Sequence, residues 1–61
     1  MEEFQRTLIK HMILYRLEKR DWDYYMDVDG EFSFVLGNRE PNTRNMNSQE
    51  LLELLDEIVR W

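Results

Sequence analysis

Residues 21–34, DWDYYMDVDGEFSF, concentrate most of the side chains with which this chain could do chemistry. They include four aspartates, one glutamate and five aromatic residues. Acidic side chains at this density suggest a calcium loop of the EF-hand type, which needs Asp at position 1, Gly at position 6 and Glu at position 12. With Gly30 at position 6, Tyr25 falls at position 1 and Leu36 at position 12. Both end ligands are missing, so the sequence predicts no calcium site.

The chain offers little for nucleophilic or acid–base catalysis. Its single histidine, His11, has no cysteine, serine or acidic partner at a useful spacing, whereas a catalytic site needs a nucleophile, a base and a group that orients the base. Ser33 falls within a strand-like alternation, while Ser48 and Thr43 have the positions of cap and loop residues. The absence of cysteine excludes disulfides and thiolate metal sites. We therefore expect a protein that is not an enzyme and that carries no metal and no cofactor.

The alternation of residues 22–36 predicts a β-hairpin. A three-residue turn that ends at Gly30 places Met26 opposite Phe32 and gathers the apolar side chains on one face, whereas a two-residue turn mixes polar and apolar groups on both faces. A slip of one residue exchanges the faces, so the hydrophobic pattern sets the register, and glycine suits the left-handed position that ends such a turn. The expected inner face is Trp22, Tyr24, Met26, Phe32, Phe34 and Leu36, and the expected outer face is Asp23, Tyr25, Asp27, Glu31, Ser33 and Val35.

The outer face of this hairpin is acidic, and it has two interpretations. Charge on exposed strands is typical of an ordinary solvated face that resists edge-to-edge aggregation. The same carboxylates, with an exposed Tyr25, would also suit a protein partner whose basic groove is built for phosphates, because complementary charge steers association. Two arginines of the following polar loop could add bidentate contacts to a carboxylate or phosphate. The residues expected to bind the partner are Asp23, Tyr25, Asp27, Glu31, Arg39 and Arg44.

Three of these carboxylates carry the hypothesis that the hairpin imitates nucleic acid. On that hypothesis Asp23, Asp27 and Glu31 matter to partner binding and little to folding. Reversing all three to lysine is then expected to abolish capture of the partner and to leave the circular dichroism spectrum intact.

The N-terminal segment, residues 2–20, predicts a helix with two apolar faces. It contains no glycine or proline and is rich in good helix formers. A surface helix ordinarily has one apolar stripe, so this helix is either sandwiched between the hairpin and another chain or central to the fold. Its i,i+4 pair Arg6 and Lys10 is interpreted as part of a solvated face, with phosphate contact as the alternative. One apolar face holds Phe4, Leu8, His11, Met12 and Tyr15, and the opposite face holds Ile9, Ile13 and Leu17.

Residues 48–60 predict a second helix, this time with a single apolar face. Asn47 and Glu50 have the spacing of a capping box, with Ser48 as the competing cap. Between the hairpin and this helix, residues 37–47 form a polar stretch that predicts a loop. Pro41 is unsuited to the interior of a strand or helix and supports that interpretation.

Length and charge limit the classes of function. The chain has 61 residues and a formal net charge of −5, and 43% of its residues are hydrophobic. A domain this small buries only about 60% of its unfolded surface, so self-association or a permanent partner is expected to add stability. Net acidity disfavours general nucleic-acid binding, which depends on phosphate neutralisation.

No apolar run approaches the roughly 18 residues of a membrane span, and the N-terminus lacks the layout of a signal peptide, so we expect no membrane contact and a cytoplasmic location.

We therefore expect an α+β fold, a single α-β-β-α domain with two helices packed on an antiparallel hairpin. Its open strand edges and doubly apolar first helix predict a homodimer, in which the strands of two copies could form a four-stranded sheet, because an isolated two-stranded sheet is marginal. The alternative is that the strand edge adds to the sheet of a different partner. The expected function is that of a small acidic, non-enzymatic binding protein that regulates or inhibits a protein partner, as inhibitors, antitoxins and accessory factors do. The alternatives are a nucleic-acid-binding transcriptional regulator that uses the basic first helix, and a structural subunit of a larger assembly. The expected elements are a helix at 2–20, a hairpin at 22–36 with strands at 22–27 and 31–36, a polar loop at 37–47 and a helix at 48–60.

Overall fold

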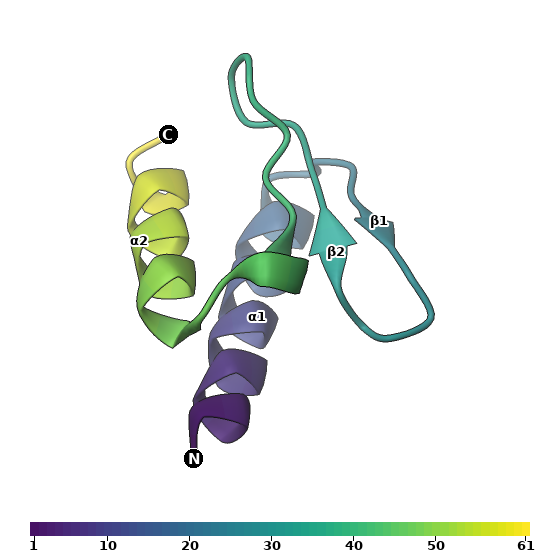
Figure 1. Ribbon diagram of the computed structural model, residues 1–61. Coiled ribbons are helices and arrows are strands. Elements are labelled where there is room, and N and C mark those ends of the chain that lie inside the picture. The colour runs from purple at the N-terminus through teal and green to yellow at the C-terminus, as the bar shows by residue number, and fades with distance from the viewer.

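Two helices and a short antiparallel hairpin form the computed structural model, which describes residues 1–61 (Figure 1). This is the expected α+β fold with the order α-β-β-α. Its elements are α1 (Glu2–Lys19), β1 (Tyr25–Met26), β2 (Phe32–Ser33), the short 3-10 helix η1 (Thr43–Asn45) and α2 (Ser48–Val59).

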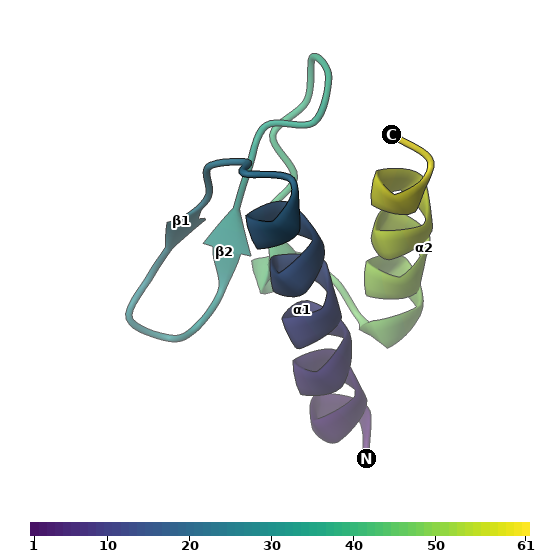
Figure 2. The ribbon, with the colours of Figure 1, turned by 180° about the vertical axis from the view of Figure 1, so that it is seen from behind.

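Helix α1 is central to the arrangement. It lies between α2 and the hairpin in Figure 1, and the view from behind in Figure 2 shows the same order. The two helices begin at the same end of the molecule and run in the same direction (Figure 1). Both helix N-termini therefore share one end, and both C-termini share the other.

The core draws on α1, the second half of the hairpin and α2. The predicted inner face of the first helix is confirmed, because Ile9, Ile13 and Leu17 are buried. The first half of the hairpin departs from the prediction: Met26 is 49% exposed, and Trp22 and Tyr24 are only partly buried against the core. The nine buried core residues are Ile9, Ile13, Leu17, Phe32, Phe34, Leu36, Leu51, Leu54 and Ile58.

The register of the hairpin is the predicted one. Tyr25 pairs with Ser33 and Met26 pairs with Phe32. Gly30 has a φ of 82°, in the left-handed region that glycine adopts without steric cost. The predicted length of the strands is wrong, since each is two residues long rather than six. The reason is that the chain after Ser33 pairs on its other side.

Residues 37–42 supply that other pairing, which the sequence did not predict. Gly37, with a φ of 66°, turns the chain back on itself, and Leu36 and Arg39 exchange backbone hydrogen bonds of 2.8 and 3.1 Å. The Phe34 N–H then donates to the Pro41 carbonyl at 3.2 Å, and Ser33 bridges to Asn42. The predicted loop thus covers one edge of β2. The four-stranded sheet across a homodimer stays a prediction, and it would have to use the free edge of β1.

The predicted capping box at the start of α2 is confirmed. The Asn47 side chain accepts the Glu50 N–H at 2.8 Å, and the Glu50 carboxylate accepts the Asn47 N–H at 2.9 Å. This reciprocal pair satisfies two of the N–H groups that a helix start leaves without partners. It therefore sets the first residue of α2 at Ser48.

The end of α1 is closed by a Schellman motif with an aspartate where glycine is usual. The Trp22 N–H donates to the Leu17 carbonyl at 2.9 Å, and the Asp21 N–H donates to the Glu18 carbonyl at 3.1 Å. Asp21 has a φ of 59° and is the only non-glycine residue with a positive φ. The turn directs the chain into the hairpin and brings Trp22 against the core.

Replacing this aspartate by glycine is predicted to stabilise the protein. A left-handed residue with a Cβ carries about 1–2 kcal/mol of steric cost, and glycine loses about 0.5–1 kcal/mol more chain entropy. We expect Asp21→Gly to raise the free energy of unfolding by about 0.5–1 kcal/mol, as measured by urea denaturation. Asp21→Ala removes the same carboxylate but keeps the Cβ, so it should not stabilise. Equal stability of the two variants would contradict the strain argument.

Candidate functional site

The six residues predicted to bind a partner do not form one surface. Glu31 turns inward, and both arginines pair with acidic side chains of the same chain. Only two of the six remain exposed and free of ion pairs, namely Asp23 and Tyr25. The binding role of all six stays a prediction, but their surroundings differ sharply.

The prediction that Glu31 lies on a solvent-exposed face is wrong. Its side chain is 12% exposed and lies between two cations, with Arg6 Nη2 at 3.2 Å and Lys10 Nζ at 3.3 Å. The Thr43 hydroxyl donates to the same carboxylate at 2.6 Å. The interpretation of Arg6 and Lys10 as a solvated face is also wrong, because they are only 8% and 9% exposed.

This buried ion network joins three segments of the chain. The Arg6 guanidinium also donates to the carbonyls of Met46 at 2.8 Å and Thr43 at 2.9 Å, which ties α1 to the segment around η1. The Thr43 hydroxyl accepts the Phe32 N–H at 3.1 Å while it donates to Glu31. No buried side-chain nitrogen or oxygen lacks a hydrogen-bond partner. The network therefore meets the requirement that buried charges be paired and hydrogen-bonded.

The network also sets the ionisation of Glu31. Burial raises the pKa of this carboxyl, but hydrogen bonds from Thr43, Arg6 and Lys10 outweigh it and hold the pKa below the usual value of 4.5. The hydrogen bond to Glu31 in turn raises the pKa of Arg6. Both groups are thus held in their charged forms.

Asp27 lies near the tip of the hairpin, where its carboxylate is held by contacts within the chain. Arg44 pairs with Asp27 and lies 3.2 Å from Asp29, while one Asp27 oxygen accepts the backbone N–H groups of Asp29 and Glu31 at 2.9 and 3.1 Å. The hydrogen bond from Arg44 is the main cause that lowers the pKa of Asp27. This side chain organises the turn and links it to η1, so its carboxylate is already engaged.

The second arginine of the loop is also engaged within the chain. Arg39 pairs with Glu57 of α2, with both side chains about half exposed. This pair connects the turn after Gly37 to α2. An exposed pair of this kind contributes little to stability and can exchange for a partner's carboxylate.

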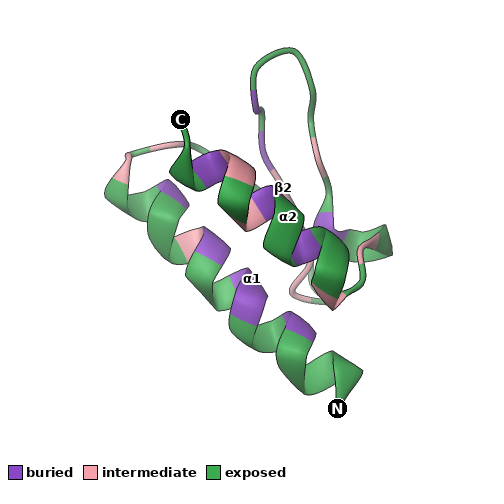
Figure 3. Ribbon diagram, turned by 90° about the vertical axis from the view of Figure 1, so that its left-hand side faces the viewer, coloured by how far each residue is buried: buried purple, intermediate pink, exposed green.

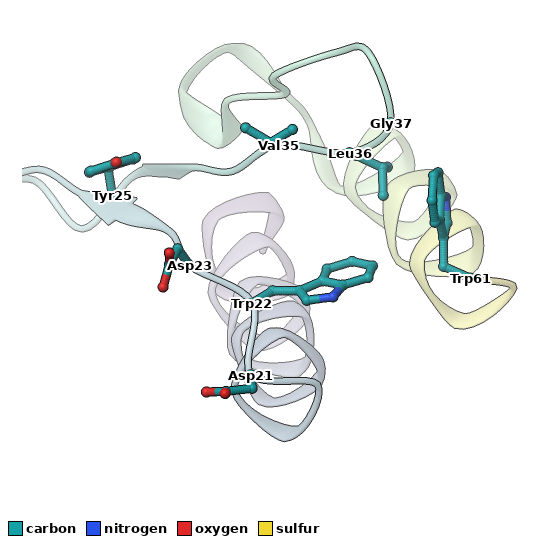
Figure 4. Close-up of a pocket in the computed structure, with 8 residues that line it drawn as sticks. All are labelled: Asp21, Trp22, Asp23, Tyr25, Val35, Leu36, Gly37 and Trp61. Carbon is teal, nitrogen blue, oxygen red and sulfur yellow. The ribbon is translucent and has the colours of Figure 1, made fainter.

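Asp23 and Tyr25 line an open hollow at the end of the molecule where the helix C-termini lie (Figure 4). Asp21 and Asp23 form no ion pair within the chain, and in Figure 4 their carboxylates point to one side of the backbone. Trp22 projects the opposite way and meets Trp61 edge to face, with ring centroids 6.2 Å apart. The hollow measures about 590 Å³, and its lining residues are Asp21, Trp22, Asp23, Tyr25, Val35, Leu36, Gly37 and Trp61.

This acidic–aromatic hollow has the chemistry to hold a basic side chain. Tyr25 and Val35 are 72% and 65% exposed and offer apolar surface to a methylene stem. Carboxylates form charge-assisted hydrogen bonds with a guanidinium or ammonium head, and aromatic rings attract the same cations. Trp61 packs on Gly37, where an added Cβ would lie 3.3 Å from the indole ring. The absence of a side chain at Gly37 thus lets Trp61 close one wall.

Other kinds of site have less to support them. No group of three or more His, Asp or Glu side chains is placed to hold a metal ion. No helix has both the length and the apolar character needed to cross a membrane. Comparison with known proteins finds no family model, no curated protein and no solved structure that matches this chain. The function must therefore be argued from the site itself.

Removing the charge of Glu31 is predicted to destabilise the fold. Glu31→Gln leaves Arg6 and Lys10 without their shared anion, and breaking such a pair on one side costs about 2–4 kcal/mol at this degree of burial. Urea denaturation measures the loss, and Glu40→Gln, an exposed acid without an ion pair, should stay within about 0.5 kcal/mol of the parent protein. If Glu31→Gln proves too unstable to measure, Thr43→Val removes the hydroxyl that donates to Glu31 and accepts the Phe32 N–H, and it should cost about 1–3 kcal/mol. Equal stability of these variants and the Glu40→Gln control would contradict the structural role of the network.

Acid is predicted to remove the contribution of Glu31. Because the folded-state pKa is lowered, its stabilisation is fully present above the usual value of 4.5 and is lost as the pH falls from there through the folded-state pKa. The difference in unfolding free energy between the parent protein and Glu31→Gln should therefore be constant at neutral pH and shrink below about 4.5. A carbon NMR titration of the Glu31 carboxyl group provides the direct check. A midpoint at or above 4.5 would refute the assignment.

Proposed function

We propose that this chain is a non-enzymatic binding protein that regulates or inhibits a protein partner in the cytoplasm. The acidic–aromatic hollow would receive a basic segment of that partner. One observation carries the proposal: the unpaired carboxylates Asp21 and Asp23 line one hollow together with exposed Tyr25 and the Trp22–Trp61 pair. Most other charged groups of the hairpin and loop are neutralised within the chain.

Asp21 supports the proposal through its backbone conformation. It occupies a left-handed position at which glycine is favoured, and its side chain forms no hydrogen bond that would explain the aspartate locally. A residue in a sparsely populated region of backbone space motivates a functional hypothesis. The hypothesis here is that the carboxylate serves a partner rather than the fold.

The hypothesis of nucleic-acid mimicry loses support because ion pairs within the chain engage two of the carboxylates on which it depends. A row of free carboxylates along the hairpin would need Asp27 and Glu31, and both are held by cations of this chain. The acidic surface left for a partner lies at the other end, around Asp21 and Asp23. This favours recognition of a short basic segment over imitation of an extended phosphate backbone.

The alternative function, nucleic-acid binding, has less support in the fold than it had in the sequence. It relied on the basic first helix, but Arg6 and Lys10 are buried against Glu31. The cations of this N-terminal segment that stay outside the network lie at the C-terminal end of α1, and they are Arg16, Lys19 and the cap residue Arg20.

The proposal predicts which charges govern partner capture. The double variant Asp21→Asn with Asp23→Lys should weaken binding at least about tenfold, because like charge is placed against a basic segment. Capture on N-terminally immobilised protein, from a nuclease-treated lysate of the native source, measures this by mass spectrometry. A partner retained by the parent protein and lost by this variant identifies the bound protein.

The matched control carries the same change of net charge elsewhere. Glu40→Lys with Glu53→Gln alters two exposed acids that lie outside the hollow. It should retain the partner, and both double variants should keep the circular dichroism spectrum of the parent protein. Equal loss of the partner in both would assign capture to net charge alone, and retention in both would refute the hollow as the binding site.

A further inference from the structure

The outer sides of α1 and α2 form a continuous apolar surface, which we call the outer helix face. On α1 the four members are each about half exposed or more, and two of them, Leu8 and Met12, line both of the shallow grooves between the helices. Figure 3 shows the two helices side by side with exposed positions recurring along each. The members of the outer helix face are Phe4, Leu8, Met12 and Tyr15 of α1 with Leu52, Leu55 and Val59 of α2.

Such a surface is unusual for a monomer of this size. The core contains nine residues, and six of the seven members of the outer helix face are exposed, while Leu55 is partly buried against the core. Soluble monomers rarely expose a contiguous apolar patch of more than a few hundred Å², and small scaffolds often gain stability by oligomerisation. A standard interface covers about 800 Å² per partner, which is less than a fifth of the 4435 Å² surface of this chain.

The charges at the two ends of the outer helix face are opposite in sign. Because the helices run in the same direction, their N-terminal turns gather at one end the acids Glu2, Glu3 and Glu50. The other end holds Arg16, Lys19 and Arg20, none of which forms an ion pair in the fold. Of the acids at this end, Glu18 accepts the Tyr24 hydroxyl at 2.8 Å, and Asp56 pairs with Arg60 at 3.0 Å. Asp21 and Asp23 are unpaired, but they line the acidic–aromatic hollow and neither of the grooves between the helices.

One acid of this end, Glu2, is held in its ionised form. The backbone N–H and the hydroxyl of Ser48 donate to Glu2 at 2.6 and 2.8 Å and lower the pKa of its carboxyl. This contact joins the starts of the two helices. The helix dipoles add positive potential at this end and negative potential at the other, so acidic side chains here and basic ones there both follow the preferred distribution.

We propose that the outer helix face binds a second copy of this chain across a two-fold axis, with the helix pairs antiparallel. A two-fold axis brings the same surface of both copies together. When the axis runs perpendicular to the helices it also reverses their direction, so the acidic end of one copy meets the basic end of the other. With Leu8 and Met12 near the axis, Phe4 of one copy lies beside Tyr15 of the other. A parallel arrangement would place like charges and like dipole ends together.

Other occupants fit this pattern less well. An anionic membrane surface would repel the acidic end and would find its basic counterpart only at the opposite end. A different protein would need a matching apolar stripe with its acidic and basic ends in the reverse order. A second copy, turned by the two-fold axis, supplies that arrangement. The two-fold dimer also differs from pairing through the strand edge of β1, because it leaves the hairpin outside the interface.

The first test is the mass of the protein in solution. Sedimentation equilibrium should show twice the chain mass of 7.6 kDa, with a dissociation constant below about 100 μM. Met12→Lys should weaken association at least tenfold and keep the helical circular dichroism signal, because the side chain is exposed in the single chain. Val28→Lys, at the fully exposed tip of the hairpin, is the matched control and should remain dimeric. A monomer at concentrations up to about 1 mM would refute the proposal.

The second test fixes the direction of the helices, using the absence of native cysteine. Phe4→Cys mixed with Tyr15→Cys should form the mixed disulfide in preference to either symmetric one. Two symmetric disulfides without the mixed product would indicate parallel helices and overturn the antiparallel arrangement. Arg16→Glu with Lys19→Glu should weaken the dimer at least tenfold at low salt, and an unchanged dissociation constant would overturn the charge pairing. None of these variants alters the acidic–aromatic hollow, so this proposal and the proposed function can fail separately.

Discussion

The carboxylate of Glu31 is the point at which the fold is held together electrostatically. It accepts contacts from Arg6 and Lys10 of α1 and from the Thr43 hydroxyl of η1, so one side chain connects three segments that are far apart in sequence. Two cations and one anion are expensive to bury, and the network offsets that cost with backbone carbonyls: Arg6 donates to Met46 and Thr43, and Lys10 to Gly30. The nine-residue core lies beside this network rather than around it, which explains how so few apolar residues can orient a hairpin against two helices.

The network also determines what the surface can offer. By taking in Arg6 and Lys10, it gives α1 three sides: an apolar side in the core, an ionic side toward the hairpin, and a second apolar side in water. The free cations of α1 are thereby confined to its C-terminal end, and the free carboxylates near the hairpin are confined to Asp21 and Asp23. The free cations and the free carboxylates that a partner could recognise are thus the charged groups that the buried network and the other ion pairs of the chain leave unpaired.

Local features were predictable from the sequence, and long-range pairings were not. The capping box joins Asn47 and Glu50, three positions apart, and the hairpin register follows from one alternating pattern around Gly30, so each was predictable from a short stretch of sequence. The pairing of Arg6 with Glu31 joins residues 25 positions apart, and no periodic pattern in the sequence indicates such a pair. The alternation of Phe32 to Leu36 gave the buried face correctly, but it carried no sign that residues 39–42 would cover the strand edge, because a segment containing Pro41 has no strand pattern of its own. Of the candidate site, Asp23 and Tyr25 were found from exposure and charge, whereas Trp61 was missed because only the fold brings the last residue beside Gly37.

The two proposed surfaces meet at the C-terminal ends of the helices, and Arg20 lies where they join. Its guanidinium stacks 5.3 Å from the Trp22 ring and donates to the Val59 carbonyl at 3.4 Å, so it touches one wall of the acidic–aromatic hollow and one member of the outer helix face. A two-fold dimer would carry two hollows, one on each copy, and two linked sites bind a bivalent or repeated basic partner far more tightly than one site does. In a chain of 61 residues, dimerisation would thus supply both the stability that a small core lacks and the avidity that a shallow hollow lacks.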